Sequence, residues 1–332
     1  MRCVIVAEHG GPEVLTLVER DHPSPGPGEV VVQVAAAGVN FIDIYQRSGA
    51  YPMELPYIVG SEGAGTVSDV GPEADLLTLG DRVAWASVPG SGATQYAVVP
   101  AERAVPVPEE VELRDAAAVM LQGMTAHYLV ESTFPAQEGQ VAVVHAAAGG
   151  VGLLLCQMLA RKGVRVIGTT STWAKADLAR SAGADEVVLT RHTDEEGSSQ
   201  AVPLAEQVLA LTQGAGVDVV YDGVGQATFD AGLTALKPRG TMVLFGAASG
   251  PVPPIDPQIL NQRGSLFLTR PSLPHHLRSR DELLWRGQDV LEGVKRGELS
   301  VTIGGEYQLE DVAQAHRDLA AGGTTGKLII LP

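Results

Sequence analysis

The sequence predicts an α/β protein that combines a doubly wound parallel sheet with a second, antiparallel and barrel-like β domain. From residue 141 onward, strands and helices alternate regularly, which is typical of parallel sheets built by right-handed crossovers. The residues up to 122 instead contain short strands separated by Gly and Pro. The length of 332 residues fits about two domains, and a hydrophobic content of 45% excludes a globally disordered chain.

The N-terminal part is predicted to consist of short antiparallel strands. The clearest are expected at 29–39, 63–71 and 81–87, with turn-forming segments such as HPSPGPGE between strands. The first ten residues, MRCVIVAEHG, contain one basic residue and an apolar run that ends at Glu8, which is too short for a secretory signal. We therefore expect a first strand here, in a cytoplasmic protein.

The parallel sheet is predicted to begin at 141–146, a continuous apolar run of the kind found in strands buried on both faces. A helix follows at 151–162 and is expected to end at Gly163. Further strands are predicted at 164–169, 186–190, 217–222 and 241–246, further helices at 173–181, 204–212 and 227–236, and a polar insertion at 190–200. Beyond residue 257 we expect a strand at 265–269, helices at 280–296 and 309–320, and a closing strand at 327–331 that returns to the first domain.

The acidic composition disfavours two classes of partner, although a local basic patch is compatible with it. Lys and Arg total 23 against 39 Asp and Glu, which gives a net charge of -16. Such a field repels phosphate backbones and anionic lipids, so we expect neither a nucleic acid nor a membrane as partner. The chain has only two cysteines, Cys3 and Cys156, too few for a disulfide framework or a four-cysteine zinc site.

A glycine-rich turn follows the first strand of the predicted parallel sheet. HAAAGGVG contains Ala147-x-Gly149-x-x-Gly152, the dinucleotide-binding pattern with alanine in its first position. Glycines here allow the pyrophosphate to approach the backbone, and the following helix offers free amides and a positive dipole. The candidate cofactor-binding residues of this turn are Ala148, Gly149, Gly150, Val151 and Gly152. The alternative is a glycine-rich turn that binds no ligand.

The end of the second strand of this sheet bears on the choice of cofactor. An NAD site usually has an acidic residue there, which holds the ribose hydroxyls. This chain has hydroxyl side chains instead, including Thr170 and Ser171, followed by Lys175, with Arg191 after the third strand. Hydroxyls and cations suit a 2′-phosphate, so these four residues predict NADPH. The alternative for Lys175 is an ordinary solvated helix lysine.

Several segments together resemble one known family, the zinc-free quinone oxidoreductases of the zeta-crystallin type within the medium-chain dehydrogenase/reductase superfamily. The segments are AAGVNFIDIYQRSGAYP, LPYIVGSEGAGTV, QGMTAHYL, HAAAGGVG, YDGVG, LFLTRPSL and TTGKLII. The resemblance implies a GroES-like catalytic domain, a Rossmann domain and NADPH in the cleft. It implies the division 1–122 for the catalytic domain, 123–262 for the Rossmann domain and 263–332 for the return segment.

The resemblance also implies that no metal is bound. Where zinc-dependent relatives place a catalytic Cys, His and Cys, this sequence has Asn40, Ser61 and Gln122, and the four-cysteine structural lobe is absent. One residue departs from the family: Thr190 stands where a tyrosine near the 2′-phosphate is common, which weakens the inference of NADPH.

The resemblance further implies the site residues. Asn40, Tyr45 and Tyr51 are the candidate donors to a developing oxyanion, while Thr125, Phe245 and Gly246 would position the nicotinamide or its ribose. The alternatives are that the two tyrosines only pack at a domain interface and that Asn40 caps a helix starting near Phe41.

The function expected from these observations is NADPH-dependent quinone reduction without a metal, since an electron-poor quinone takes hydride without a Lewis acid. An alternative within enzymes is reduction of an activated C=C bond in an enone or enoyl thioester. Alternatives from other classes are a lens-type structural role and RNA binding, which the phosphate loop and the negative charge respectively disfavour. The resemblance also implies a homodimer.

Overall fold

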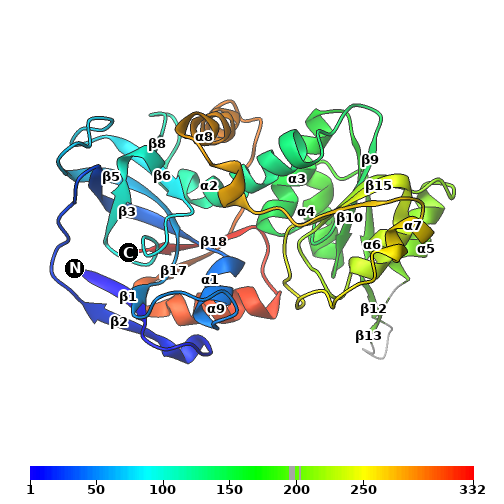
Figure 1. The fold of residues 1–332 in the computed structure, drawn as a ribbon, viewed down its shortest axis with the longest axis horizontal. Coiled ribbons are helices and arrows are strands. Elements are labelled where there is room, and N and C mark those ends of the chain that lie inside the picture. The colour runs from blue at the N-terminus through cyan, green and yellow to red at the C-terminus, as the bar shows by residue number, and fades with distance from the viewer. Residues whose placement is uncertain (194–198, 202) are drawn as a thin grey trace. The chain divides into compact units, whose positions relative to one another are not determined.

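The computed structural model describes residues 1–193, 199–201 and 203–332. These residues form two compact units (Figure 1), Met1–Met124 with His276–Pro332 as unit 1, and Thr125–His275 as unit 2. The predicted division ended the Rossmann domain at 262. Residues 263–275 group with unit 2 instead, because strand β16 (Phe267–Thr269) pairs with β15 (Leu236–Leu244) in the sheet of that unit.

Unit 1 contains two sheets. The larger is seven-stranded with the order β17-β18-β3-β5-β6-β8, and β7 pairs with β3 outside this path. The smaller has the order β2-β1-β4. The strands are β1 (Arg2–Val6), β2 (Leu15–Glu19), β3 (Glu29–Val39), β4 (Tyr57–Ile58), β5 (Glu62–Val70), β6 (Arg82–Ala86), β7 (Tyr96–Pro100), β8 (Val105–Pro106), β17 (Ile303–Gln308) and β18 (Lys327–Leu331). The closing strand β18 pairs antiparallel with β3, so its predicted return to the first domain is confirmed.

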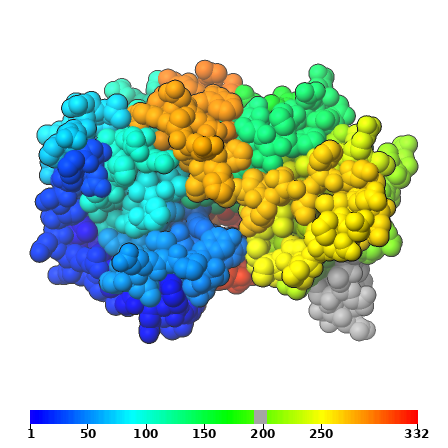
Figure 2. All heavy atoms as spheres, in the orientation of Figure 1, coloured from blue at the N-terminus to red at the C-terminus, as the bar shows by residue number. Residues whose placement is uncertain are grey.

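Helices of unit 1 lie against these sheets. They are α1 (Phe41–Arg47), the first part of α2 (Leu113–Tyr128), α8 (Arg280–Lys295) and α9 (Val312–Ala321). Helix α8 packs against β8, and its outer side, coloured orange, is exposed on the surface (Figure 2). A single 3₁₀ turn at Leu273–His276 spans the boundary between units 2 and 1, and others occur at Pro12–Val14, Ala101–Arg103 and Leu309–Asp311. The last of these occupies the start of the helix predicted at 309–320, so α9 begins later than expected.

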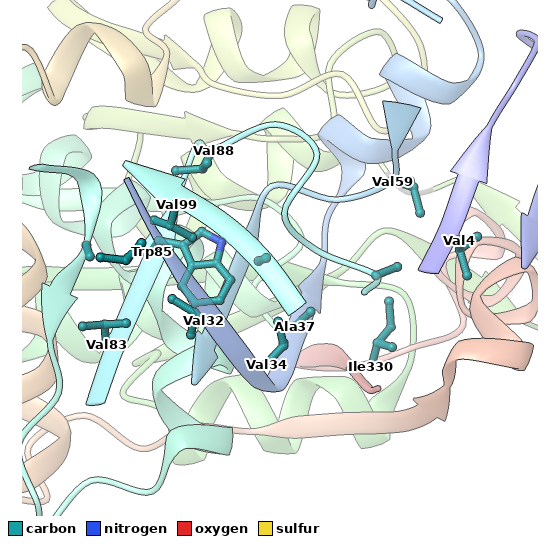
Figure 3. Close-up of a cluster of buried hydrophobic side chains, with 14 of the residues drawn as sticks. Val4, Val32, Val34, Ala37, Val59, Val83, Trp85, Val88, Val99 and Ile330 are labelled. Carbon is teal, nitrogen blue, oxygen red and sulfur yellow. The ribbon is translucent and has the colours of Figure 1, made fainter. Parts of the chain in front are cut away.

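The core of unit 1 includes the side chain of Trp85, which is fully buried. Valines from several strands surround it, and Figure 3 shows Val32, Val83, Val88 and Val99 around the indole ring. The indole Nε1 donates a hydrogen bond to Ser91 Oγ over 2.7 Å, which satisfies the one polar atom of this side chain. This apolar packing holds the strands from which the candidate active-site residues emerge.

Unit 2 is built on a six-stranded sheet with the order β11-β10-β9-β14-β15-β16, and all neighbouring strands are parallel. Its strands are β9 (Val141–Val144), β10 (Arg165–Thr170), β11 (Glu186–Leu189), β14 (Val217–Asp222), β15 and β16. Its helices are α3 (Gly150–Arg161), α4 (Trp173–Ser181), α5 (Leu204–Leu211), α6 (Phe229–Ala235) and α7 (Gln258–Gln262), and a π-helical turn spans Leu129–Thr133. The doubly wound parallel sheet predicted from the sequence is confirmed.

Two parts of unit 2 differ from the sequence-based expectation. Strand β15 begins at Leu236 rather than near 241, because an irregular pairing with β14 at Val217 extends it backward, and α6 is correspondingly shorter. The predicted polar insertion contains the antiparallel pair β12 (Arg191–Thr193) and β13 (Ser199–Ala201), while 194–198 lie outside the described residues. Within the described part of the chain, no helix is long and apolar enough to cross a membrane.

Candidate active and cofactor sites

The predicted dinucleotide turn lies at the carboxyl end of β9, between that strand and helix α3. The backbone turns at Ala146, which has a positive φ of 52°, and the Gly149 N–H donates to the Ala146 carbonyl oxygen over 2.9 Å. Gly149 is the N-cap of α3, which begins at Gly150. The turn therefore delivers the free amides at the start of α3 to the carboxyl edge of the sheet, where ligands of doubly wound folds bind.

The two glycines of the motif have different surroundings. A Cβ on Gly152 would overlap the carbonyl oxygen of Ala146 and would lie 2.8 Å from Ala147 Cα. A Cβ on Gly149 would meet only the Ala146 carbonyl oxygen, at 3.2 Å. Gly152 is thus required by the packing of helix on turn, whereas Gly149 leaves one side of the backbone open for a ligand.

Alanine is accommodated at the first position of the motif by a glycine in the neighbouring strand. A Cβ on Gly168 in β10 would lie 2.9 Å from the methyl group of Ala147. Ala147 also donates its N–H to the Thr169 carbonyl oxygen over 3.0 Å, which fixes the turn against β10. The motif therefore keeps its geometry despite the missing first glycine, because Gly168 provides the space.

The carboxyl end of β10 carries the residues predicted to select the cofactor. Thr170 is buried, and its hydroxyl donates to the Thr172 carbonyl oxygen over 3.3 Å, while Ser171 is exposed. The Thr172 hydroxyl oxygen caps α4 by accepting the N–H of Lys175 over 3.3 Å. Partial burial lowers the pKa of the Lys175 ammonium. Between Thr169 and Lys175 the chain has no carboxylate to repel a phosphate.

Arg191 belongs to the same edge of the sheet. The preceding residue, Thr190, donates its N–H to the Thr170 carbonyl oxygen over 2.7 Å, so the ends of β11 and β10 lie side by side. Arg191 is exposed. Two cations and two hydroxyl groups, from Lys175, Arg191, Thr170 and Ser171, therefore lie at or shortly after the ends of two adjacent strands.

The ends of β14 and β15 complete this edge. Phe245 and Gly246 follow β15 directly, and both N–H groups donate to the carbonyl oxygen of Asp222, over 2.8 and 3.3 Å. The Asp222 carboxylate is buried and accepts hydrogen bonds from the N–H groups of Val224 and Gly225 and from the Thr228 hydroxyl, over 2.7, 3.0 and 2.8 Å. Asp222 therefore holds the loop in which the candidate nicotinamide-positioning residues lie.

In unit 1, the candidate residue Asn40 lies where the end of β3 meets the starts of β5 and β18. Its amide nitrogen donates to Glu62 Oε2 over 2.8 Å, and its oxygen accepts from the Lys327 ammonium over 2.7 Å. Lys327 also donates to Glu62 Oε2, over 2.5 Å. All three side chains are at least nine-tenths buried.

Asn40 is also the N-cap of helix α1, which is the alternative role that the sequence suggested for it. The Asn40 N–H donates to Asp43 Oδ2 over 2.8 Å, and the Asp43 N–H donates to the Asn40 carbonyl oxygen over 3.1 Å. Burial raises the pKa of the Asp43 carboxyl to about 7, although the Asn40 N–H and the charge of Lys327 favour ionisation. Helix α1 then carries Tyr45, which is half-buried, toward the exposed Tyr51.

Comparison with known proteins places this arrangement in a family. Residues 26–109 match the alcohol dehydrogenase GroES-like domain, and residues 150–278 match the zinc-binding dehydrogenase domain. A quinone oxidoreductase of Pseudomonas aeruginosa is 42% identical over 327 residues, which cover 98% of each chain. This chain is a member of the quinone oxidoreductase family. The predicted resemblance and the predicted Rossmann and GroES-like fold are confirmed.

Two further relatives bear on cofactor and substrate. The structure of a mycobacterial protein complexed with NADPH matches with a TM-score of 0.94 and 48% identity, covering 100% of both chains. A 2-haloacrylate reductase of a Burkholderia species is 37% identical over 335 residues, covering 99% of this chain and 98% of its own. The quinone oxidoreductase family thus lies close to a protein named as a 2-haloacrylate reductase.

A zinc ion does not fit the residues of this quinone oxidoreductase, although the matching domain is described as zinc-binding. The positions of the expected zinc ligands hold Asn40, Ser61 and Gln122, and the ammonium of Lys327 already occupies the acceptors of Asn40 and Glu62. Within the residues that the structure describes, there is no group of three His, Cys, Asp or Glu side chains able to hold a metal. The absence of a metal stays a prediction.

The predicted site residue Thr125 lies on helix α2. It is buried within helix α2, at the first position of unit 2. Sequence reasoning in turn missed Glu62, Lys327 and Asp222. Each is a buried charged residue at the end of a strand, and a buried charge is a usable signal because it needs a specific partner.

Proposed function

We propose that this quinone oxidoreductase reduces quinones with NADPH, as the sequence led us to expect. The observation that carries the proposal is the similarity to quinone oxidoreductases over essentially the whole chain, from the barrel strands to the closing strand. The glycine turn before α3 supports a dinucleotide, and the end of β10, with hydroxyls and a lysine in place of a carboxylate, supports a 2′-phosphate.

The residues of the chain bind and orient in this reaction. NADPH, when bound, supplies a hydride, and the proton that completes the hydroquinone comes from solvent. Gly149 and the first amides of α3 bind the pyrophosphate, while Ser171, Lys175 and Arg191 bind the 2′-phosphate. Asn40, Tyr45 and Tyr51 donate hydrogen bonds to the quinone oxygen as negative charge develops on it. Phe245 and Gly246, with Thr125, hold the nicotinamide end.

A second candidate function is the reduction of an activated C=C bond. The 2-haloacrylate reductase that aligns over 99% of this chain is the observation that favours it. The same hydrogen-bond donors would stabilise an enolate or a carboxylate-conjugated carbanion instead of a hydroquinone anion.

A panel of acceptors separates the two candidates. NADPH oxidation is measured with ortho-quinones, para-quinones, enones, 2-haloacrylate and enoyl thioesters under identical conditions. We expect kcat/KM to be highest for one of the quinone classes. A higher value for an enone, haloacrylate or thioester would replace quinone reduction with C=C reduction as the main activity.

We propose further that the protein is a cytoplasmic homodimer. Strand β16 supports self-association because it lies at the edge of the six-stranded sheet and exposes 61% of Phe267. Both cysteines are buried free thiols, which suits a reducing compartment. Sedimentation equilibrium tests the dimer, and a monomer at micromolar concentration would contradict it.

A further inference from the structure

The contacts of Asn40, Glu62 and Lys327 carry an inference beyond the family's quinone chemistry. Lys327 is 1% exposed and Glu62 is fully buried, although a buried ion pair gains little stability over an apolar pair of the same volume. The second carboxylate oxygen of Glu62, Oε1, accepts a hydrogen bond from the N–H of Leu121 over 2.5 Å. The pair is thus bonded to a backbone amide on one side and to the Asn40 carboxamide on the other.

Strand register brings the three residues together. Strand β3 is antiparallel to both β5 and β18, and Ala37 pairs with Gly63 while Val39 pairs with Leu328. The end of β3, where Asn40 follows, therefore meets the first residue of β5, Glu62, and the first residue of β18, Lys327. Gly38 makes room for the cluster, because a Cβ there would overlap Glu62 Oε2 and lie 2.6 Å from Lys327 Cε.

The chemistry of the pair allows only one orientation of the Asn40 carboxamide. The lysine ammonium only donates hydrogen bonds and the glutamate carboxylate only accepts them. The amide oxygen of Asn40 must therefore face Lys327 and its NH₂ group must face Glu62. A rotation by 180° would set the NH₂ group against the ammonium and the oxygen against the carboxylate.

This orientation leaves one N–H of Asn40 without a good acceptor in the described residues. The nitrogen has the Gly38 carbonyl oxygen at 3.5 Å, longer than an ordinary N–H···O bond. A flip of the carboxamide would replace this donor with an acceptor, which would repel a developing oxyanion instead of stabilising it.

We propose that Glu62 and Lys327 are positioning residues that lock the Asn40 carboxamide as a hydrogen-bond donor toward the substrate oxygen. The inference rests on the proposed hydride-transfer function and adds to it two residues that do not themselves touch substrate. A pair retained only for folding would leave the reaction unchanged when both charges are replaced together by groups of similar volume.

The test is the double variant Glu62→Gln/Lys327→Met, which removes both charges and so leaves no unpaired buried ion. We expect single-turnover hydride transfer to fall about 10- to 100-fold with the best acceptor of the parent enzyme. The Kd for NADPH should change less than about twofold, because the nucleotide-binding residues lie in unit 2. The matched control is Arg286→Met/Glu282→Gln, which removes another pair with a buried cation in unit 1 and should leave the hydride-transfer rate unchanged.

A double-mutant cycle with Asn40→Ala shows whether the pair acts through Asn40. If it does, the loss caused by Glu62→Gln/Lys327→Met should nearly disappear in the Asn40→Ala background. An equal loss in both backgrounds, or a parent-like rate in the double variant, would overturn the proposal. Should the double variant fail to fold, Glu62→Gln/Lys327→Gln, which also removes both charges, takes its place with the same two outcomes.

Different experimental outcomes reject the proposed function and the inference about Glu62 and Lys327. Absence of quinone reduction by the parent enzyme rejects the function, and the cycle is then run with whichever C=C acceptor the parent reduces. Parent activity together with additive losses rejects only the role of Glu62 and Lys327.

Discussion

The rings of Tyr45 and Tyr51 face each other with their centroids 5.3 Å apart and their planes inclined at 55°. The Tyr51 N–H also donates to the Tyr45 carbonyl oxygen over 3.0 Å, so the loop after α1 is fixed to the helix. Tyr51 nevertheless exposes 44% of its surface, more than a tyrosine kept only for packing requires. Tyr51 is therefore held against Tyr45 while much of its surface stays accessible to solvent.

The first prediction concerns the Tyr51 hydroxyl. Tyr51→Phe should lower the single-turnover rate of hydride transfer about 10- to 100-fold, because a donor to the developing oxyanion is lost. The fold and the Kd for NADPH should stay nearly unchanged, since one oxygen atom is removed. The loss should be smallest with electron-poor quinones and largest with enones, whose developing enolate depends more on the donor.

Stopped-flow measurement of NADPH absorbance with both classes of acceptor checks this prediction. Tyr307→Phe serves as the control, because it removes a tyrosine hydroxyl of the same unit that is bonded to Asp318 over 2.7 Å. Parent-like rates for Tyr51→Phe with both acceptors would reduce Tyr51 to a packing residue.

Much of unit 2 was predictable from the sequence because its elements obey local rules. The strands β9 and β14 and the helix at Trp173–Ser181 fall within the ranges that the hydrophobic pattern predicts. The glycine turn was predictable for the same reason, since strand, turn and helix are consecutive in the chain.

The Asn40 cluster was not predictable in this way. Lys327 lies far along the chain from Asn40, and only the antiparallel register of β18 on β3 brings their side chains to 2.7 Å. A one-residue shift of that register would turn Lys327 to the other face of the sheet. The family resemblance indicated Asn40 as a candidate, but its partners depend on tertiary pairing that no local pattern encodes.

The second prediction concerns Lys175. Lys175→Ala should weaken NADPH binding by about 1.5–3 kcal/mol, because a charge-assisted contact to the 2′-phosphate is lost, and by less if Arg191 compensates or solvent screens the pair. NADH, which lacks this phosphate, should bind almost as before. Fluorescence titration of both cofactors makes the comparison, and equal losses would show that Lys175 does not contact the phosphate.

The third prediction separates the two glycines of the dinucleotide turn. Gly152→Ala should destabilise unit 2 by about 1–3 kcal/mol, because its methyl group overlaps the Ala146 carbonyl oxygen. Gly149→Ala should cost less than about 1 kcal/mol, since Gly149 has an ordinary φ of -78°, yet it should raise the Kd for NADPH at least about tenfold. Thermal unfolding and cofactor titration of both variants measure the two effects. Identical behaviour of the variants would contradict this division of roles.

The fourth prediction concerns metal. Prolonged treatment with a strong zinc chelator should leave kcat and KM unchanged, because the ammonium of Lys327 occupies the acceptors of Asn40 and Glu62. Elemental analysis of the purified protein should show zinc far below one equivalent. Zinc near one equivalent, with activity lost on its removal and regained on its return, would refute the prediction.

The last prediction concerns two buried groups of unit 1 that titrate in opposite senses. Burial raises the pKa of Asp43 from 3.8 to about 7, so between these values the folded protein holds a proton that the unfolded chain has released. Stability from this group is therefore lost as pH rises through that range. Burial, with the charge of Arg47, lowers the pKa of His316 from 6.5 to about 3, so there the unfolded chain holds the extra proton and stability rises with pH.

The two contributions oppose each other between about pH 4 and 6.5, and each single variant removes one of them. Relative to the parent, the free energy of unfolding of Asp43→Asn should rise with pH, by at most about 1.4 kcal/mol per pH unit, because the Asp43 contribution that falls with pH is removed. His316→Gln should show the reverse slope, and its side-chain oxygen can still accept the Arg47 hydrogen bond that His316 Nδ1 receives over 3.2 Å. Urea unfolding at pH 5.0, 5.75 and 6.5 measures both slopes, with Asp177→Asn at an exposed site as control. Slopes of the same sign in the two variants would show that Asp43 and His316 do not titrate as their burial predicts.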